Sequence, residues 1–93
     1  MKLPTVYDEI PPKERWKVRE EYVKLQKGMC YYCYACLKGL PEESIAKKKV
    51  TPKFYPTGFF DHPVHLHHSH VTGMTIGAVH AHCNAVLWEY EGE

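Results

Sequence analysis

Histidines are concentrated in one part of this chain. Six of its seven histidines lie in the segment HLHHSHVTGMTIGAVHAH, residues 65–82. A neutral imidazole binds metals and accepts a proton near neutral pH, so the segment can support metal binding or general-base chemistry. Side chains alternate between faces along a strand, so His67 and His68 can serve one reaction centre only if the strand ends or bends there. The alternative is that these histidines are packed or surface residues that bind metals nonspecifically.

Two short pairs of potential metal ligands accompany the histidines. Cys30 and Cys33 have the C-x2-C spacing, and His80 and Cys83 have the H-x2-C spacing. Two such pairs separated by an insert are what a tetrahedral structural zinc site requires, because each pair forms a turn that presents two ligands to one ion. The pairs therefore predict a Cys3His zinc site.

The spacing leaves the choice of ligands open. Cys33 and Cys36 also form a C-x2-C pair, and His82 can take the place of His80. Without a metal, the cysteines would be small buried apolar residues. Asn84 directly follows the last cysteine, so a zinc-bound turn would fix its position, and its amide oxygen can complete a hard-metal site.

The length and composition are those of one small globular domain. The chain has 93 residues, of which 44% are apolar and 25% charged. A domain near this size buries a small core and gains from a structural metal. It has no apolar run of about 18 residues, and its first segment, MKLPTVYDEIPPKE, lacks the apolar core of a signal peptide. We therefore expect a cytoplasmic protein without a membrane partner, whose cysteines are metal ligands or free thiols rather than disulfides.

Charge is distributed unevenly along the chain, although the net charge is only +1. All 12 lysines and arginines lie in residues 1–53, which carry a net charge of +5, whereas residues 54–93 carry −4. A basic part beside a histidine-rich part suits phosphate contacts on one side and metal chemistry on the other. The simpler alternative is that the basic residues solvate a helix and a loop.

The first element that must position these residues is a predicted helix over residues 12–27. Pro12 suits the first helical position, and a glycine follows Lys27, where the helix is expected to stop. Val18, Tyr22 and Leu25 would form its apolar face, since they follow the i, i+4, i+7 spacing.

The rest of the chain predicts a turn, a loop, two strands and a helix. Residues 29–43 are predicted to form a compact cysteine-bearing turn, and residues 44–58 a loop with four lysines, two prolines and a glycine. A strand is predicted to end near His67, a second strand to span residues 75–80, and a short helix to span residues 82–93.

The order of these motifs resembles the phage recombination endonuclease VII family, within the ββα-metal (HNH, His-Me finger) nucleases. The resemblance rests on HLHHSHVTG, GAVHAHCNAVL and the upstream WKVREEYVKLQKGMCYYC, which looks like the family's helix and Gly-x-Cys-x-x-Cys knuckle. It covers residues 15–36 and 64–88. It implies an α+β fold: one small zinc-stabilised ββα-metal nuclease domain over residues 1–93, with an N-terminal helix and a ββα-metal core over residues 64–90.

The resemblance also implies specific roles for individual residues. It favours Cys30, Cys33, His80 and Cys83 as the structural zinc ligands. His68 falls at the position of the general base that activates water. His67 and Asn84 fall at the positions that bind the catalytic divalent ion, and His70 falls at a second histidine of the active-site loop, as a phosphate contact or auxiliary acid.

The implied activity is that of a metal-dependent DNA endonuclease. It would nick DNA or cut both strands by phosphodiester hydrolysis, leaving 5′-phosphate and 3′-hydroxyl ends, with structural Zn²⁺ and a catalytic Mg²⁺, Mn²⁺ or other divalent transition metal. The implied partners are double-stranded or branched DNA, and in addition a second copy of the chain or a phage protein. A phage-encoded enzyme would act in the cytoplasm of the bacterial host. Candidate phosphate contacts are Arg15, Arg19, Lys47, Lys48 and Lys49.

Three departures from the family pattern bear on the function. His67 replaces the family's aspartate, and a neutral ligand favours Mn²⁺, Ni²⁺ or another transition metal over Mg²⁺. His80 replaces a family cysteine, which still leaves a Cys3His site. The helical region that pairs two subunits in junction-resolving members is absent from residues 1–93. We therefore expect junction resolution only if another surface dimerises.

Three other functions fit the same residues. A non-catalytic zinc module would bind nucleic acid or a phage protein without cutting. A nuclease specific for RNA or single strands would use the same site on another substrate. A metal-storage or transport peptide would bind several ions weakly instead of one zinc tightly.

Overall fold

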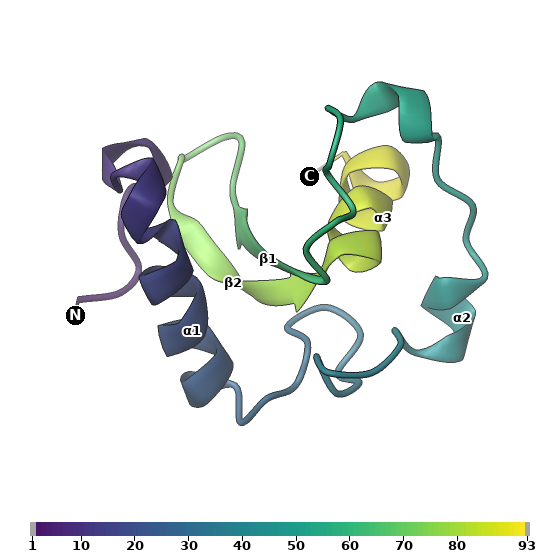
Figure 1. Ribbon diagram of the computed structural model, residues 1–93, viewed down its shortest axis with the longest axis horizontal. Helices are drawn as coiled ribbons and strands as arrows, with labels where there is room; N and C mark the ends of the chain where they lie inside the picture. The colour runs from purple at the N-terminus through teal and green to yellow at the C-terminus, as the bar shows by residue number, and fades with distance from the viewer. Residues whose placement is uncertain (1, 93) are drawn as a thin grey trace.

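The computed structural model describes residues 2–92 as a small compact α+β domain (Figure 1). A β-hairpin lies in the middle, with α1 against one end of it and α3 continuing from the other (Figure 1). The elements in chain order are η1 (Tyr7–Glu9), η2 (Pro12–Glu14), α1 (Arg15–Leu25), α2 (Glu43–Ala46), η3 (Pro52–Phe54), β1 (Val64–His68), β2 (Thr75–His80) and α3 (Ala81–Glu91). None of the helices over residues 2–92 has the length and apolarity needed to cross a bilayer.

The N-terminal helical segment is shorter than the predicted span of residues 12–27. It begins as the 3-10 turn η2 at Pro12 and becomes α-helical only over Arg15–Leu25. It cannot extend to residue 27, because Lys27 and the glycine after it have φ angles of +57° and +79°, the left-handed region in which helices end. Val18 and Tyr22 are buried as predicted, but Leu25, the last residue of α1, is 64% exposed.

The two strands lie where they are predicted, and they are joined in an irregular register. β1 pairs antiparallel with β2, with Val64 opposite His80 and His67 opposite Gly77. The next pair is His68 with Thr75, so Ile76 is an extra residue in β2. Such a bulge bends and twists the strand pair locally. The hairpin is therefore irregular between His67 and His68, the two histidines that are predicted to serve one reaction centre.

The N-terminal segment pairs with the hairpin through an isolated β-bridge. Val6 bridges to Met74, the backbone N–H of Tyr7 donates to the carbonyl of Gly73 at 2.8 Å, and Thr75 donates to the carbonyl of Thr5 at 2.8 Å. These bonds bring residues at the start of the chain beside the end of β1. The buried core lies between α1, the cysteine-bearing turn, β2 and α3, and consists of Ile10, Val18, Tyr22, Cys30, Leu37, Ala78, Val79, Cys83 and Leu87.

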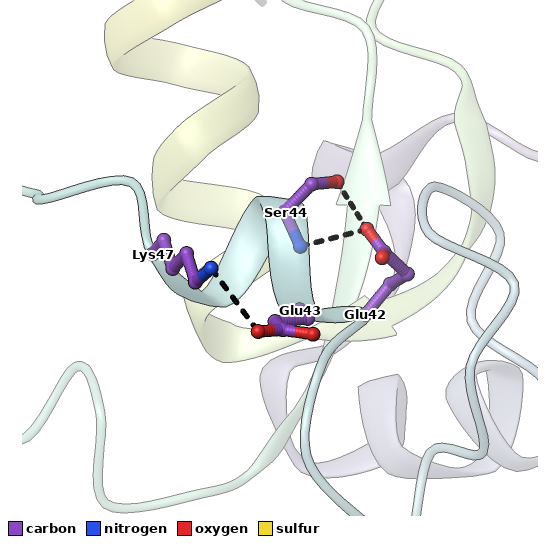
Figure 2. Close-up of polar contacts among 4 residues, drawn as sticks. All are labelled: Glu42, Glu43, Ser44 and Lys47. Carbon is purple, nitrogen blue, oxygen red and sulfur yellow. Dashed lines mark hydrogen bonds and ion pairs between the residues drawn. The ribbon is translucent and has the colours of Figure 1, made fainter.

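The predicted loop over residues 44–58 contains two short helical elements, α2 and η3. Glu42 caps α2 by accepting a hydrogen bond from the backbone N–H of Ser44 at 3.0 Å, as Figure 2 shows. Nε2 of His82 donates to the carbonyl of Ile45 at 2.9 Å and holds α2 against α3. Hydrogen bonds from Thr51 to Glu89, and from Tyr90 to the backbone of residue 49, attach the following segment to α3 as well. The prediction of a plain loop missed these elements because their anchors lie about 40 residues away in the sequence.

Gln26 completes the free edge of β2 and leaves no room for a side chain at Gly77. Its amide donates to the carbonyl of Ala78 at 2.9 Å and accepts from the N–H of Ala78 at 2.8 Å. A Cβ atom on residue 77 would lie 2.7 Å from Oε1 of Gln26 and 3.1 Å from Cβ of Tyr31. Gln26 cannot turn away without losing both bonds to Ala78.

We therefore expect Gly77→Ala to lower the free energy of unfolding by about 1–3 kcal/mol, the usual cost of overpacking. Urea denaturation measures this. Gly39→Ala is the matched control, because a Cβ there meets nothing closer than 3.8 Å. It should change stability by no more than about 0.5 kcal/mol. Equal stability of the two variants would show that the Gln26 contact is not restrictive.

Candidate metal centre and histidine pocket

Four potential metal ligands converge between the cysteine-bearing turn and the start of α3. The ligand atoms of Cys30, Cys33, His80 and Cys83 all lie within 4.8 Å of one another. Nδ1 of His80 is 3.5 Å from Sγ of both Cys33 and Cys83. A tetrahedral zinc with Zn–N of about 2.0 Å and Zn–S of about 2.3 Å places such atoms about 3.5 Å apart. The donor set and its spacing thus fit a structural Zn²⁺.

The imidazole of His80 is oriented as a zinc ligand requires. Its Nε2 is 2.9 Å from the carbonyl oxygen of Cys36. A carbonyl only accepts hydrogen bonds, so Nε2 carries the proton and Nδ1 presents its lone pair to the sulfurs. A second hydrogen bond of this kind is the usual way in which proteins fix a metal-binding histidine. Cys36 therefore contributes its backbone, while its exposed thiol stays outside the cluster.

The local backbone explains how the first two ligands come together. After α1, the bridge between Met29 and Cys36 closes a tight turn around Cys30 and Cys33. The N–H of Cys33 lies 3.5 Å from Sγ of Cys30, and the N–H of Glu42 lies 3.4 Å from Sγ of Cys33. Donors directed at sulfur stabilise the thiolate form, which is the form that binds metal.

The second pair of ligands belongs to the junction of β2 and α3. A hydrogen bond from Cys83 lowers the pKa of the Cys30 thiol to about 4, while the same contact raises the pKa of Cys83. Thiol groups must lose their protons to bind zinc, and the contact favours this loss at Cys30. The structure gathers the set of ligands favoured by the resemblance, and His82 lies outside the cluster, bonded to α2.

A pocket of about 640 Å³ opens on the other side of α3's first turn, between α1, β1 and α3. All four residues predicted to be catalytic line it, namely His67, His68, His70 and Asn84. They come from β1, from the turn after it and from the first turn of α3. His67 is buried, with 4% of its surface exposed.

His68 is held by aromatic neighbours at the bulge of the hairpin. Its ring stacks on Tyr7 with centroids 3.9 Å apart and planes at 10°, and His70 meets it edge-on at 5.1 Å. Burial, followed by the charges of His70 and His67, lowers the pKa of His68 and keeps it neutral near pH 7. Tyr7 was not predicted, because only the pairing of the N-terminal segment with β2 brings it to this site.

A chain of hydrogen bonds orients Asn84. Nε2 of His65 is 2.8 Å from the carbonyl oxygen of Phe59, so this nitrogen carries the proton. Burial lowers the pKa of His65, so its Nδ1 is an acceptor, and it lies 3.1 Å from Nδ2 of Asn84. The amide nitrogen of Asn84 is thus the donor, and its oxygen is left for another partner. His65 belongs to the predicted histidine cluster, but no role was predicted for it.

The five basic residues named as phosphate contacts divide into two groups. Arg15 and Arg19 line the pocket, and the Nε atoms of both are buried without a hydrogen-bond partner among the described residues. The guanidinium of Arg15 lies 4.3 Å from the centre of the Tyr7 ring, and Arg19 approaches Glu20 at 3.7 Å. Both guanidinium groups therefore place positive charge at the pocket.

The three lysines are not among the residues that line the pocket within the described chain. They follow α2, which lies beyond α3 from α1 (Figure 1). Lys47 forms an exposed ion pair with Glu43 at 3.1 Å (Figure 2), and Lys48 lies 5.1 Å from the centre of the Tyr90 ring.

The fold and the cluster together define a small α+β domain in which a β-hairpin and the following helix carry a buried Cys3His metal-binding group. Comparison with protein-family models finds no match for this chain, and searches of curated proteins and of solved structures find no significant match either. The function is therefore argued from the residues of this chain.

Proposed function

We propose that this protein is a metal-dependent DNA endonuclease of the HNH type. The observation that carries the proposal is the convergence of His67, His68 and Asn84 on one pocket, beside the Cys3His cluster. These residues combine a potential general base with nitrogen and oxygen ligands for a divalent ion. The arginines at the same pocket supply the positive charge that a phosphodiester requires.

Each residue has a distinct part in the proposed reaction. His67 and Asn84 would hold the divalent ion, which supplies Lewis-acid stabilisation of the scissile phosphate and of the leaving 3′ oxygen. His68 would take a proton from the attacking water. Attack on phosphorus breaks its bond to the 3′ oxygen and gives 5′-phosphate and 3′-hydroxyl ends. His70, in contact with the ring of His68, serves as a phosphate contact or auxiliary acid.

The cluster and the hydrogen-bond chain support this assignment by the way they place Asn84. Asn84 follows Cys83 in the first turn of α3, so a bound zinc fixes the backbone from which its side chain projects. His65 accepts from its amide nitrogen, which directs the amide oxygen to be the metal ligand. The proposed zinc is structural, and it acts on the reaction only by holding this helix start in place.

We expect the purified zinc-loaded protein to nick or linearise supercoiled plasmid DNA when Mn²⁺ or Mg²⁺ is added. Cleavage should be faster with Mn²⁺, because a histidine in place of a carboxylate is a poor Mg²⁺ ligand. Gel electrophoresis of the plasmid, with ligation of the products to establish their ends, measures both. DNA binding without cleavage, whichever divalent ion is added, would contradict the proposal. Cleavage of RNA but not of DNA would assign RNA as the substrate instead.

The second candidate function is a zinc module that binds nucleic acid or a phage protein without cutting it. The neutral ligand His67 favours this candidate, since it weakens the site for Mg²⁺. Added divalent ions should then have no effect on the DNA, while the folded protein still retards it in a gel.

A further inference from the structure

One end of the pocket is aromatic rather than histidine-rich. The lining residues there are Phe54, Tyr55, Phe59 and Trp88. Phe54 ends η3, and Tyr55 and Phe59 belong to the segment between η3 and β1. Phe54 is 54% exposed and Trp88 is 43% exposed. Large exposed aromatic rings grouped in a hollow indicate a surface that contacts a partner.

These rings are held in place by bonds that leave their outer surfaces open. The hydroxyl of Tyr55 donates to Glu89 at 2.6 Å, and Glu89 also accepts from the backbone N–H of Thr51 at 2.8 Å. Trp88 meets Phe54 and Tyr55 edge-on, each at a centroid distance of 5.8 Å. Rigid aromatic rings with free surface are suited to stacking flat ligands.

The aromatic end is continuous with the proposed reaction centre. Asn84 and Trp88 are four residues apart in α3, so they share one face and are separated by one turn of about 5.4 Å. A nucleotide with its phosphate at Asn84 would therefore have a base, its own or its neighbour's, within reach of Trp88. Arg15 and Arg19 line the same pocket and complement the charge of the phosphates.

We propose that Trp88 stacks an unpaired nucleobase beside the scissile phosphate, while Phe54, whose ring lies at 73° to that of Trp88, borders the same surface. Paired bases in a duplex are stacked on each other, so only an unpaired or flipped base can present its face to these rings. The protein then prefers DNA with unpaired nucleotides, such as single strands or single-stranded flaps, over uniform duplex. This inference rests on the proposed function, which puts the scissile phosphate at Asn84. It narrows the class of DNA substrate expected at that site.

Oligonucleotide binding, measured without added divalent ions, tests base stacking separately from cleavage. In a Trp16→Phe background Trp88 is the only tryptophan, so its fluorescence reports stacking directly. We expect a short oligothymidine to quench this fluorescence and to bind more tightly than a duplex of the same length. An abasic oligonucleotide of equal length keeps the phosphates, but it should bind weakly and leave the fluorescence unchanged.

Substitution of the rings gives a second measure. Trp88→Ala should weaken oligothymidine binding by about 5- to 150-fold, the fold-change that corresponds to loss of one base–aromatic stack. Trp88→Tyr should restore most of it. Trp16→Ala is the matched control, since Trp16 is 52% exposed but is not a pocket residue, and it should bind like the wild type. Circular dichroism confirms that each variant is folded.

Several results would overturn the inference. These are equal binding of the abasic and thymidine strands, tighter binding of duplex than of single strand, or unchanged affinity in a folded Trp88→Ala variant. Binding of oligouridine but not oligothymidine would overturn the assignment to DNA. Base stacking without any metal-dependent cutting would remove the nuclease proposal and leave the base-binding site standing.

Discussion

We expect His68→Ala to cleave plasmid DNA about 10²- to 10⁴-fold more slowly than the wild type, the range that follows removal of a general base. The imidazole lines the pocket with Asn84 and His67, and burial keeps it neutral and ready to accept a proton. Its ring stacks on Tyr7, so the substitution also costs about 0.5–1.5 kcal/mol of stability. Initial cleavage rates, measured together with thermal unfolding and the zinc content, separate the two effects.

The matched control for this variant is His82→Ala. It also removes a histidine, but this ring lies outside the pocket and bonds the carbonyl of Ile45. Its cleavage rate should stay within a few-fold of the wild type, and its zinc content should be unchanged. Activity close to wild type in a folded His68→Ala protein would remove His68 from the mechanism.

We expect Cys30→Ser and Cys83→Ser each to lose the proposed structural zinc and to unfold the domain. Structural zinc contributes about 10–16 kcal/mol to the free energy of folding in small zinc domains. The whole free energy of unfolding of a native protein is about 5–15 kcal/mol. Both thiols are buried in the core. Without the ion, the remaining polar ligand groups would be buried without their partner, between α3 and the cysteine-bearing turn. Circular dichroism should show loss of helix, and metal analysis should show less than one zinc per chain.

Cys36→Ser is the matched control for the cluster. Cys36 is in the same turn, but its thiol is exposed and only its backbone carbonyl contacts His80. This variant should keep one zinc and fold like the wild type. A soluble, folded Cys83→Ser chain that retains one tight zinc would refute the assignment of the ligands.

Local patterns in the sequence predicted the longer elements but not their contacts. They placed β2, the end of β1 and the helix α3 within one or two residues, because these signals depend on neighbours along the chain. The ends of α1 were less predictable, and Leu25 is exposed although it follows the helical spacing. Leu25 is the last residue of α1, and helical spacing alone does not show that the core does not cover this end of the helix.

The metal cluster was predictable because its ligands come in two local pairs. C-x2-C and H-x2-C spacings constrain a turn, so the four ligands were expected together before any fold was known. The choice between His80 and His82 was not local. It depends on Cys36, whose carbonyl accepts from Nε2 of His80 across 44 residues, and on the contact that takes His82 to α2.

By itself, the sequence determined which chemistry is available here: a Cys3His group, clustered imidazoles and an asparagine after the last ligand. Only the tertiary structure decided what each group faces. It brought Tyr7 to His68 through pairing of the N-terminal segment with β2, and Asn84 of α3 to His65 of β1. It also placed the arginines, but not the lysines, at the pocket. Such contacts join residues far apart in the chain, and packing and hydrogen bonding select them rather than local periodicity.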